Sequence, residues 1–299
     1  MMESLGNVPV NREEHYVPPE VRMYSAIGAY FKEQGLLNKE QVEKVLRSQQ
    51  QSGLRFGEEA VRLGLLTQGQ IDLILRRQFD VSTLALGESA ISTEVVAAYN
   101  PDCPSIGPLR SLRTVLMSRH TKRGSRGHTL AITSMHAKDG RSLVAANLAV
   151  LFSQIGMRSI IVDADLRNPR QHQLFGIAAK HGLSIALARH SLQSMVEKVN
   201  GLGPLSLLPA GALPPSPEQL LNRPVFALLL GELQKEFDIV ILDTPAGTRH
   251  IEALLVAEQA SHTIVIARKD RTRCEELSRF MSSLDAVKAN VVATILRIG

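Results

Sequence analysis

Several residue types are scarce in this chain of 299 residues, and each scarcity argues against a class of protein. Its two cysteines, Cys103 and Cys274, stand in no CxxC or Cys/His spacing. This argues against a disulfide framework or a structural zinc site, and it predicts a reducing compartment, by default the cytoplasm. The chain has no Trp and only four Tyr, too few aromatic residues for stacking platforms on single-stranded nucleic acid. No nucleic-acid partner is therefore expected.

Long hydrophobic runs are also missing. The first residues carry acids and no apolar core, so we expect no signal peptide. The longest apolar stretch, 143–152, contains Asn147 and is far shorter than the ~20 residues that a membrane span requires. Membrane contact is therefore expected only through a partner or a surface patch. The 44% of hydrophobic residues and the modest net charge of +5 predict one or two domains with a buried core.

An internal repeat organises the first part of the chain, after a polar, Pro-containing arm at 1–20 that is expected to be flexible. Residues 27–49 align with 56–78 at an offset of 29, with eight identities in 23 positions. Each copy predicts a short helix, a Gly-Leu-Leu turn, an N-cap at Asn38 or Thr67, and a second helix. Two such helical pairs predict one small domain over 21–80.

The repeat resembles the N-terminal domain of type II secretion and pilus ATPases, some of which bind cyclic di-GMP through tandem motifs. Its second copy keeps the Arg-x-Gly opening of those motifs as Arg55-Phe56-Gly57, whereas the first copy has Ala at 26 in place of the Arg. Loss of one guanidinium removes a bidentate partner for phosphate or guanine. A protein-docking role is therefore favoured for this domain, with cyclic di-GMP binding as the alternative.

Beyond a connector at 81–126, short apolar runs alternate with longer amphipathic segments over 127–299. The runs are 130–133, 159–162, 205–208, 237–242, 263–267 and 291–296. Strands this apolar are buried on both faces, which requires helices on both sides of a mostly parallel sheet. The predicted fold class is therefore α/β, with the chemistry at the carboxyl ends of the strands.

The first run leads into a loop, 134–142, with the sequence Ser-Met-His-Ala-Lys-Asp-Gly-Arg-Ser. A strand, a tight loop that ends Gly-basic-Ser and then a helix form the arrangement that cradles phosphates. The match is imperfect, because Met135 stands where the motif has its first Gly and Arg141 replaces its Lys. Taken alone, an ordinary strand-to-helix turn fits this segment equally well.

Acidic residues follow two of the later runs. Asp163 and Asp165 come after 159–162, and Asp243 comes after 237–242. Such carboxylates position Mg²⁺ and an attacking hydroxyl or water in phosphoryl transfer. Each has a plainer interpretation, as a capping residue or an acidic strand end. The three elements together, in this order, predict a site for ATP and Mg²⁺.

Together these residues resemble the P-loop ATPases of the partition and septum-site class and, within it, the bacterial tyrosine kinases of polysaccharide export. The strings 168–175, 207–211, 243–247 and 267–272 are similar to chain-length-determinant tyrosine kinases of the EpsG type. The resemblance covers nearly the whole chain from about Ile27 onward.

The resemblance implies a role for each residue of the site. Nucleotide binding would fall to Arg268 and to the loop and helix start, which comprise Lys138, Asp139, Gly140, Arg141, Ser142 and Leu143. Mg²⁺ would be held by Ser142, Asp163, Asp165 and Asp243. Transfer of the γ-phosphoryl group to a tyrosine hydroxyl would rest on Asp163, Asp165 and Arg141. The implied partner is a membrane polysaccharide co-polymerase, which would hold this chain at the membrane periphery, and homo-oligomerisation is left open.

Departures from the family pattern keep other functions open. Lys138-Asp139-Gly140 stands where the family has Gly-Glu-Gly, which puts a side chain where such a loop needs a positive φ. The assembly motif Glu-x-x-Arg-x-x-Arg reads Gly-Pro-Leu-Arg-Ser-Leu-Arg at 107–113, the last strand lacks the base-binding Asn, and no Tyr follows Tyr99. A catalytically decayed adaptor is therefore the alternative function. A partitioning ATPase is the third hypothesis, weakened by His136 where that class has a Lys.

Overall fold

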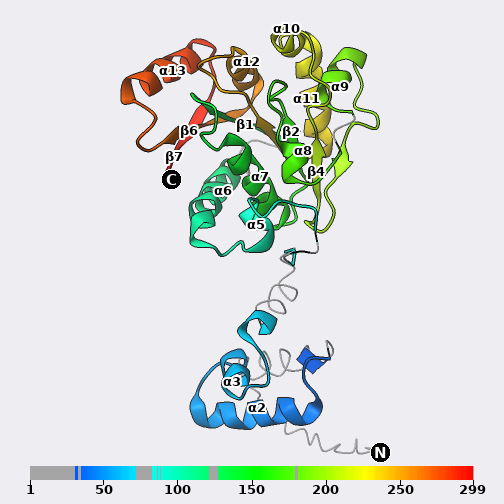
Figure 1. The fold of residues 1–299 in the computed structure, drawn as a ribbon, viewed down its shortest axis with the longest axis vertical. Helices are drawn as coiled ribbons and strands as arrows, with labels where there is room; N and C mark the ends of the chain where they lie inside the picture. Colours follow the sequence, from blue (N-terminus) through cyan, green and yellow to red (C-terminus); the bar gives the residue numbers. More distant parts are fainter. Residues whose placement is uncertain are drawn as a thin grey trace, which may run out of the picture. The chain divides into compact units, whose positions relative to one another are not determined.

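A computed structural model describes most of the chain (Figure 1). The described residues are 31–32, 35–71, 83–85, 87, 89–120, 127–178 and 181–298. The predictions for the arm at 1–20 and for the first Gly motif at 26–28 fall outside them. The chain divides into two compact units, Met1–Phe79 and Asp80–Gly299. Within the described residues, no helix is both long enough and apolar enough to cross a membrane.

The first unit is built around α2 (Lys39–Ser52) and α3 (Phe56–Arg62). Asn38 caps α2 as predicted: its side chain accepts the Gln41 N–H at 2.8 Å, and the Gln41 side chain accepts the Asn38 N–H at 2.8 Å. The core contains Phe31 and Phe56, whose stacked rings lie 5.9 Å apart between centroids. Apolar contacts between the two halves of the repeat therefore hold this unit together.

The internal repeat is visible in the backbone of both Gly-Leu-Leu turns. Gly35 has φ +69° and Gly64 has φ +66°, the left-handed conformation that commonly ends a helix. The residue after each Gly donates its N–H to the carbonyl five residues earlier, at 3.1 Å in the first turn and 3.0 Å in the second. Thr67 and Gln70 then repeat the reciprocal cap of α2. The two turns and their caps agree with the predicted 29-residue repeat, which stays a prediction over the rest of its length, as does the resemblance to secretion ATPases.

The second unit is a seven-stranded sheet in the order β3-β4-β2-β5-β1-β6-β7. The strands are β1 (His128–Ser134), β2 (Ser159–Asp163), β3 (Glu197–Lys198), β4 (Leu205–Leu208), β5 (Ile239–Asp243), β6 (His262–Arg268) and β7 (Val291–Arg297). All six predicted runs form strands, and every pair is parallel except β3 with β4. The sequence did not predict β3, because two exposed residues carry no apolar pattern.

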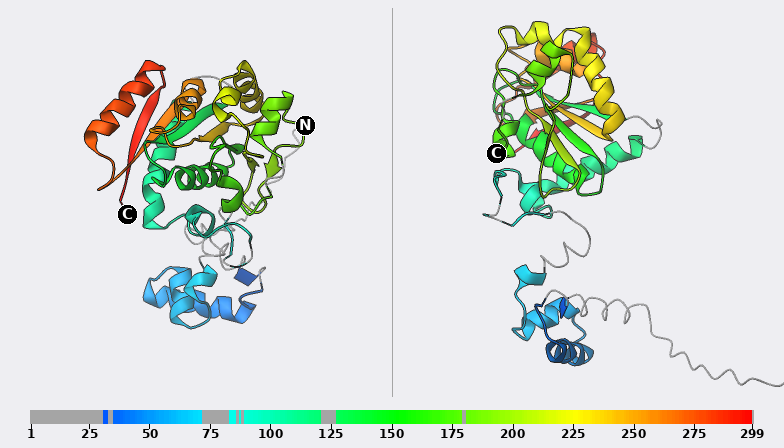
Figure 2. Two further views of the ribbon diagram at one scale, coloured as in Figure 1. Left: turned by 45° about the horizontal axis from the view of Figure 1, so that its top comes forward. Right: turned by 90° about the vertical axis from the view of Figure 1, so that its right-hand side faces the viewer.

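Helices cover both faces of this sheet (Figures 1 and 2). They are α5 (Val96–Tyr99), the 3₁₀ turn η1 (Pro104–Ile106), α6 (Gly107–His120), α7 (Arg141–Ser153), α8 (Gln171–Leu174), α9 (Leu183–Arg189), α10 (Pro217–Leu221), α11 (Pro224–Glu236), α12 (Glu252–Gln259) and α13 (Cys274–Ala286). In β1, Leu130 and Ile132 pack with α5, α6 and α7, whereas Ala131 packs with α9 to α12. This alternation confirms the predicted α/β architecture.

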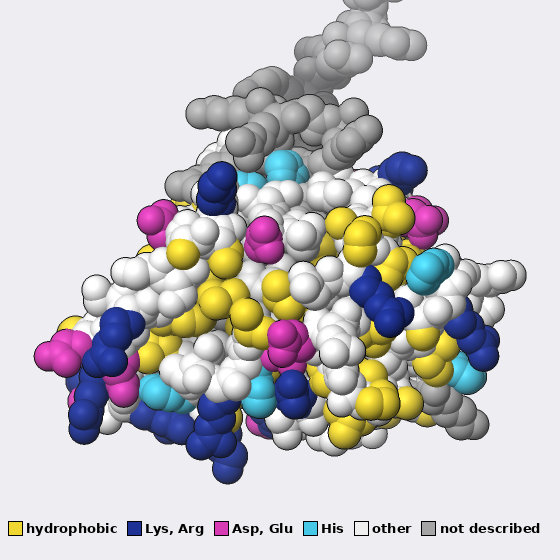
Figure 3. Space-filling view, turned by 90° about the horizontal axis from the view of Figure 1, so that it is seen from above, with side chains coloured by type: hydrophobic (Ala, Val, Ile, Leu, Met, Phe, Trp, Pro, Cys, Tyr) yellow, Lys and Arg dark blue, Asp and Glu magenta, His cyan; other side chains and the backbone are white. Residues whose placement is uncertain are grey.

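Helix α7 is the most deeply buried helix next to the sheet, which is why its sequence is apolar on all sides. On the surface, exposed apolar side chains are scattered; Leu213, Leu228 and Ile298 are examples. On the face drawn in Figure 3, hydrophobic side chains form small groups separated by polar atoms. Single exposed apolar residues of this kind are normal for a protein surface.

Candidate functional site

A cavity of about 670 Å³ lies around the loop that joins β1 to α7, at the carboxyl ends of the parallel strands. It is lined by two acids, Glu94 and Asp165, and by six Lys and Arg residues. The basic residues are Lys138, Arg141, Arg170, Arg249, Arg268 and Arg297. The excess of positive charge suits an anionic ligand, in the position that a parallel sheet predicts for its ligand.

The loop holds two residues in left-handed conformations. Lys138 has φ +67°, which confirms the expectation that a side chain occupies a position with positive φ. This conformation costs a non-glycine residue roughly 1–2 kcal/mol. Gly140 has φ +101° and is the N-cap of α7. A Cβ at position 140 would also meet the guanidinium of Arg297, the movable end of a flexible side chain, so the positive φ is the main reason for glycine there.

Arg141, which replaces the Lys of the motif, turns toward the protein interior and is only 7% exposed. Its Nε donates to the Thr244 carbonyl at 2.7 Å, and its Nη1 donates to the His136 carbonyl at 2.8 Å and to the Ser134 hydroxyl. Its Nη2 lies 3.9 Å from Asp165 Oδ2. The guanidinium therefore braces the loop against the end of β5, with much of its hydrogen-bonding capacity already used.

Asp163 and Asp243 stand side by side, paired in register at the ends of β2 and β5. Both are fully buried. Asp163 Oδ2 accepts the backbone N–H groups of Arg170 at 3.0 Å and Gln171 at 2.9 Å, and Asp243 Oδ2 accepts the Gln171 Nε2 at 2.7 Å. Within the described residues, the Oδ1 atom of each carboxylate has no hydrogen-bond partner. Buried acceptors left in this way mark a place for a ligand.

Burial raises the pKa of both carboxyl groups. For Asp163, burial and then the neighbouring charge of Asp243 raise the pKa well above its usual value. For Asp243, burial raises the pKa to about 6, although the Arg141 charge and hydrogen bonds from Gln171 and Ser142 oppose the shift. Because two adjacent carboxylates repel each other, a metal cation or a proton between them is strongly favoured.

The other predicted carboxylates have different surroundings. Asp165 lies two residues beyond the end of β2, lines the cavity, and accepts the Asn168 N–H at 2.9 Å. Asp139 is fully buried and accepts the His136 N–H at 2.9 Å, with Arg271 Nη1 3.8 Å from its other oxygen. Asp139 does not line the cavity. Its observed contacts therefore brace the loop.

The remaining predicted residues gather at the cavity. Ser142 and Leu143, in the first turn of α7, both line it. Arg268, at the end of β6, lines it as well, and its Nη1 reaches the Lys138 carbonyl at 3.5 Å. The structure therefore brings residues together from the ends of β1, β2, β5 and β6, as expected for a site at one edge of a parallel sheet.

The sequence reasoning missed several residues of the site, Gln171 and Arg297 among them. Gln171 is fully buried, and its Nε2 joins Asp243 to the Ser142 carbonyl, at 2.7 and 3.0 Å. Gln171 lies in the segment 168–175, which resembles the family. Nothing in its residue type or its neighbours predicts that its side chain is buried. Arg297 lines the cavity from the end of β7, where the sequence drew attention only to a missing Asn.

The donor set fits a metal ion that arrives with a phosphorylated ligand. Among the described residues, no group of three or more His, Cys, Asp or Glu side chains is placed to hold a metal ion by itself. Mg²⁺ is usually bound through one or two carboxylates, with substrate phosphates and water completing its six ligands. The unpartnered oxygens of Asp163 and Asp243, close to Ser142, supply that kind of partial site.

The arginines of the assembly motif contact their own chain. Arg110 pairs with Asp102 at 2.6 Å, and Arg113 donates from Nη1 to the Leu151 carbonyl of α7 at 2.7 Å. The second contact ties α6 to α7. Both groups therefore have an intramolecular role in this structure, whatever else they bind.

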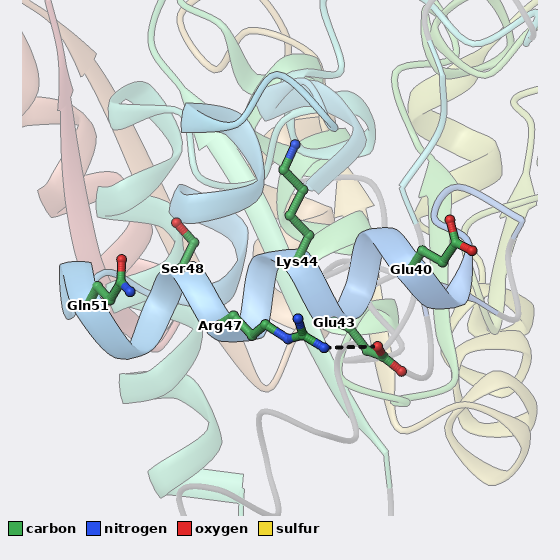
Figure 4. A pocket seen from close by; sticks show the side chains of 6 residues that line it. All are labelled: Glu40, Glu43, Lys44, Arg47, Ser48 and Gln51. Atoms are coloured by element: carbon green, nitrogen blue, oxygen red, sulfur yellow. Dashed lines mark ion pairs between the residues drawn. The ribbon is translucent and has the colours of Figure 1, made fainter.

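A second hollow, of about 450 Å³, lies along α2 in the first unit (Figure 4). Its lining includes two acids, Glu40 and Glu43, and two bases, Lys44 and Arg47. Arg47 Nη2 lies 3.7 Å from Glu43 Oε2. Charges of both signs line this hollow in equal number, without the excess of positive charge found in the first cavity.

The sheet order, the loop before α7 and the strand-end carboxylates define the P-loop ATPase fold. The septum-site-determining protein MinD of Pyrococcus horikoshii, whose structure is a complex with Mg-ADP, shares this fold with a TM-score of 0.50 and 18% identity, over 57% of this chain and 70% of that one. The search with family models finds no match.

Within this fold, the relatives of the chain are bacterial tyrosine kinases. The kinase domain of Escherichia coli tyrosine kinase ETK has a TM-score of 0.64 and 28% identity over 68% of this chain and 80% of that one. The tyrosine-protein kinase YwqD of Bacillus subtilis is 27% identical over 70% of this chain and 87% of its own length. The tyrosine-protein kinase wzc of Salmonella typhimurium is 29% identical over 68% of this chain, which spans only 28% of that kinase. The resemblance to this family is confirmed.

Proposed function

We propose that this chain binds Mg·ATP at the β1–α7 loop and transfers the γ-phosphoryl group to a tyrosine hydroxyl, in the control of exopolysaccharide chain length, synthesis or export. One observation carries this proposal: two fully buried, adjacent carboxylates each present an oxygen without a hydrogen-bond partner beside the loop, within the described residues. Buried polar atoms are normally hydrogen-bonded, so two such oxygens side by side indicate a place for a ligand.

The residues present fit ATP and Mg²⁺. Asp163 and Asp243 offer the two unpartnered oxygens, and Ser142 stands in the first turn of α7. The free backbone N–H groups at the start of a helix can bind an anion, and the helix dipole favours negative charge there. In this proposal Ser142 and Asp243 hold the metal, with Asp165 near them at the cavity, and Asp163 keeps its unpartnered oxygen for the acceptor hydroxyl. The loop from Lys138 to Leu143 surrounds the phosphates.

When bound, Mg·ATP supplies the transferable phosphoryl group and the cation that offsets its charge. The loop amides and the start of α7 hold the phosphates and stabilise negative charge as it develops. Asp163 Oδ1 orients the tyrosine hydroxyl and accepts its proton while the phenolic oxygen bonds to phosphorus and ADP leaves. The raised pKa of Asp163 makes its carboxylate a stronger base than an ordinary aspartate, as proton uptake requires.

The partner in this proposal is a membrane polysaccharide co-polymerase. It would hold the chain at the cytoplasmic surface of a membrane, and the first unit is the candidate for docking. The family resemblance supports this arrangement.

A catalytically decayed adaptor is the second candidate function, favoured by two observations. Lys138 occupies a left-handed position in the loop, and Arg141 is engaged by protein carbonyls. Both are consistent with a loop that holds its shape for structural reasons. In the adaptor, docking rather than phosphoryl transfer would be the activity under selection.

Calorimetric titration of the full chain with Mg·ATP tests the site, alongside a kinase assay that follows phosphotyrosine. We expect micromolar binding, and a loss of at least tenfold in Ser142→Ala, because that substitution removes a metal-facing hydroxyl. Ser282→Ala removes an exposed hydroxyl of α13 and is the matched control. The Lys138→Gly variant tests the adaptor.

Absence of binding in the natural protein would contradict the proposal. Recovery of binding in Lys138→Gly would then identify the adaptor, because it would show that the side chain at 138 had closed the loop. Binding of Mg·ATP without phosphotyrosine on any protein would retain the site and reject the kinase.

A further inference from the structure

Two arginines reach the phosphate loop from the side opposite to the carboxylates. Arg268 ends β6 and Arg297 ends β7, and the two residues are partners in the register of that strand pair. Strand β1, which leads into the loop, lies between β5 and β6 in the sheet. The acids of β2 and β5 therefore flank the loop on one side, and the arginines of β6 and β7 flank it on the other.

Both guanidinium groups lie against the loop itself. A Cβ built on Gly140 would overlap Arg297 Nη1 and would lie 3.1 Å from its Cδ and 3.2 Å from its Cζ. Arg268 Nη1 is 3.5 Å from the Lys138 carbonyl. The Arg297 backbone is fixed as well, because its carbonyl accepts the Lys269 N–H at 2.9 Å. The strand end therefore fixes where the Arg297 side chain begins, and Gly140 leaves room for its guanidinium beside the loop.

Arg268 and Arg297 differ from Arg141 and Arg170 in lacking an ion pair within the described residues, and they differ from Arg249, which is exposed, in being partly buried. Arg141 is held by protein acceptors and Asp165, and Arg170 pairs with Glu94 at 2.7 Å. Within the part of the chain that the structure describes, neither Arg268 nor Arg297 has an ion pair, and both are partly buried in the cavity wall. A partly buried guanidinium beside a phosphate loop, with no carboxylate partner, is suited to bidentate binding of a phosphate.

We propose that Arg297, with Arg268 beside it, binds an oligophosphate at this loop and neutralises its charge. Arg141 is less available for that task, because its guanidinium is turned into the protein interior and bonded there. The identity of the ligand as a nucleotide rests on the proposed function, whereas the binding of its phosphates by Arg297 does not. The ligand chemistry is that of a di- or triphosphate lying across Gly140, with the metal-binding oxygens on one side and the guanidinium groups on the other.

Titration of the full chain with two probes, inorganic tripolyphosphate and Mg·ATP, tests this inference. We expect Arg297→Ala to weaken binding of both probes about tenfold or more, equivalent to about 1.4 kcal/mol, because it removes hydrogen bonds from a charged donor to the phosphate oxygens. Arg297→Lys keeps the charge but loses the fork of donors, so it should recover only part of the loss. Binding by Arg297→Ala should also depend less steeply on salt.

The matched control is Arg279→Ala, on exposed α13, where the guanidinium lies 4.0 Å from Glu275 outside the cavity. It should bind both probes as the natural protein does. Thermal unfolding of each variant establishes that it is folded. If Arg297→Ala proves unfolded, Arg297→Gln, which keeps most of the chain length, provides the same comparison.

Each outcome has a definite meaning. Unchanged binding of both probes by a folded Arg297→Ala overturns the inference, and so does tighter binding, which would show that the guanidinium obstructs the cavity. Tripolyphosphate binding that depends on Arg297, with no Mg·ATP binding by any variant, supports the inference and rejects the proposed function. If the natural protein binds neither probe, both fail.

Discussion

The two units each contain fully buried carboxylates, and their surroundings are opposite. In the first unit, Glu59 accepts hydrogen bonds from Arg62, Ser48 and Ser52, and those bonds, Arg62 first, lower its pKa to about 2. In the second unit, Asp163 and Asp243 each keep an oxygen without a partner among the described residues, and burial raises the pKa of both.

The comparison separates a structural acid from a candidate functional one. Burial alone does not distinguish them, because all three side chains are fully buried. The difference lies in whether the fold supplies a partner for every lone pair. Both oxygens of Glu59 accept hydrogen bonds, and those from Ser48 and Ser52 join α3 to α2. Asp163 and Asp243 each keep one oxygen without a partner among the described residues. Unmatched buried acceptors with perturbed pKa values concentrate at sites of chemistry.

The largest expected effect concerns the functional side of this comparison. Asp163→Asn should lower phosphotyrosine formation by about 10² or more, because positioned general bases contribute about 10²–10⁴ in rate. The fold should remain as stable as before or become more stable, because one of two repelling buried charges is removed. Phosphotyrosine blots and thermal unfolding measure the two quantities. Asp285→Asn, at an exposed position of α13, is the control; an equal loss there would break the assignment.

The same change on the structural side should do the reverse. Glu59→Gln removes the charge that Arg62 and two serines surround, so we expect the first unit to unfold at a clearly lower temperature. Mg·ATP binding by the second unit should be unaffected. Glu43→Gln, on the exposed face of α2, should leave the unfolding temperature unchanged. A Glu59→Gln variant with unaltered unfolding would remove the distinction between the two kinds of acid.

The pH dependence of stability should have opposite signs in the two units. The pKa of Asp243 is raised from 3.8 to about 6, so its contribution favours the folded state below about 4 and is lost as the pH rises through 6. The pKa of Glu59 is lowered from 4.5 to about 2, so its contribution is present above 4.5 and is lost as the pH falls toward 2.

Urea unfolding as a function of pH measures both effects. Asp243→Asn should flatten the profile between about pH 4 and 6, and Glu59→Gln should flatten it below about pH 4.5. Curves of either variant that run parallel to the natural protein over its own window would contradict the corresponding assignment.

The smallest effect is expected in the loop that neighbours the aspartates. Lys138→Gly relieves a left-handed conformation, so it should stabilise the second unit by about 1 kcal/mol. Asp270 also has a positive φ, of +61°, and Asp270→Gly is the matched control for the general gain from glycine at such positions. If only Lys138→Gly alters Mg·ATP binding, the side chain at 138 acts on the site as well as on stability.

The sequence predicts the parts of the site that local patterns determine. Apolar runs mark the strands, and acids directly after two of those runs become Asp163 and Asp243, because parallel strands end at one edge of the sheet. The inward turn of Arg141 could not be predicted, since it depends on the Thr244 carbonyl, 103 residues further along the chain. Arg297 could not be placed either, because its contact with Gly140 arises only when β7 joins the sheet beside β6.

The repeated turn of the first unit also records how that unit arose. Residues 35–41 and 64–70 share a left-handed glycine, the same backbone bonds and the same reciprocal cap, so a duplication of one ancestral helical hairpin accounts for both. These two segments have the same turn and cap, while Lys39 and Glu40 stand at the positions that Gln68 and Gly69 hold in the other copy. At these paired positions, all of which are exposed, the two copies therefore present different residues on the same turn.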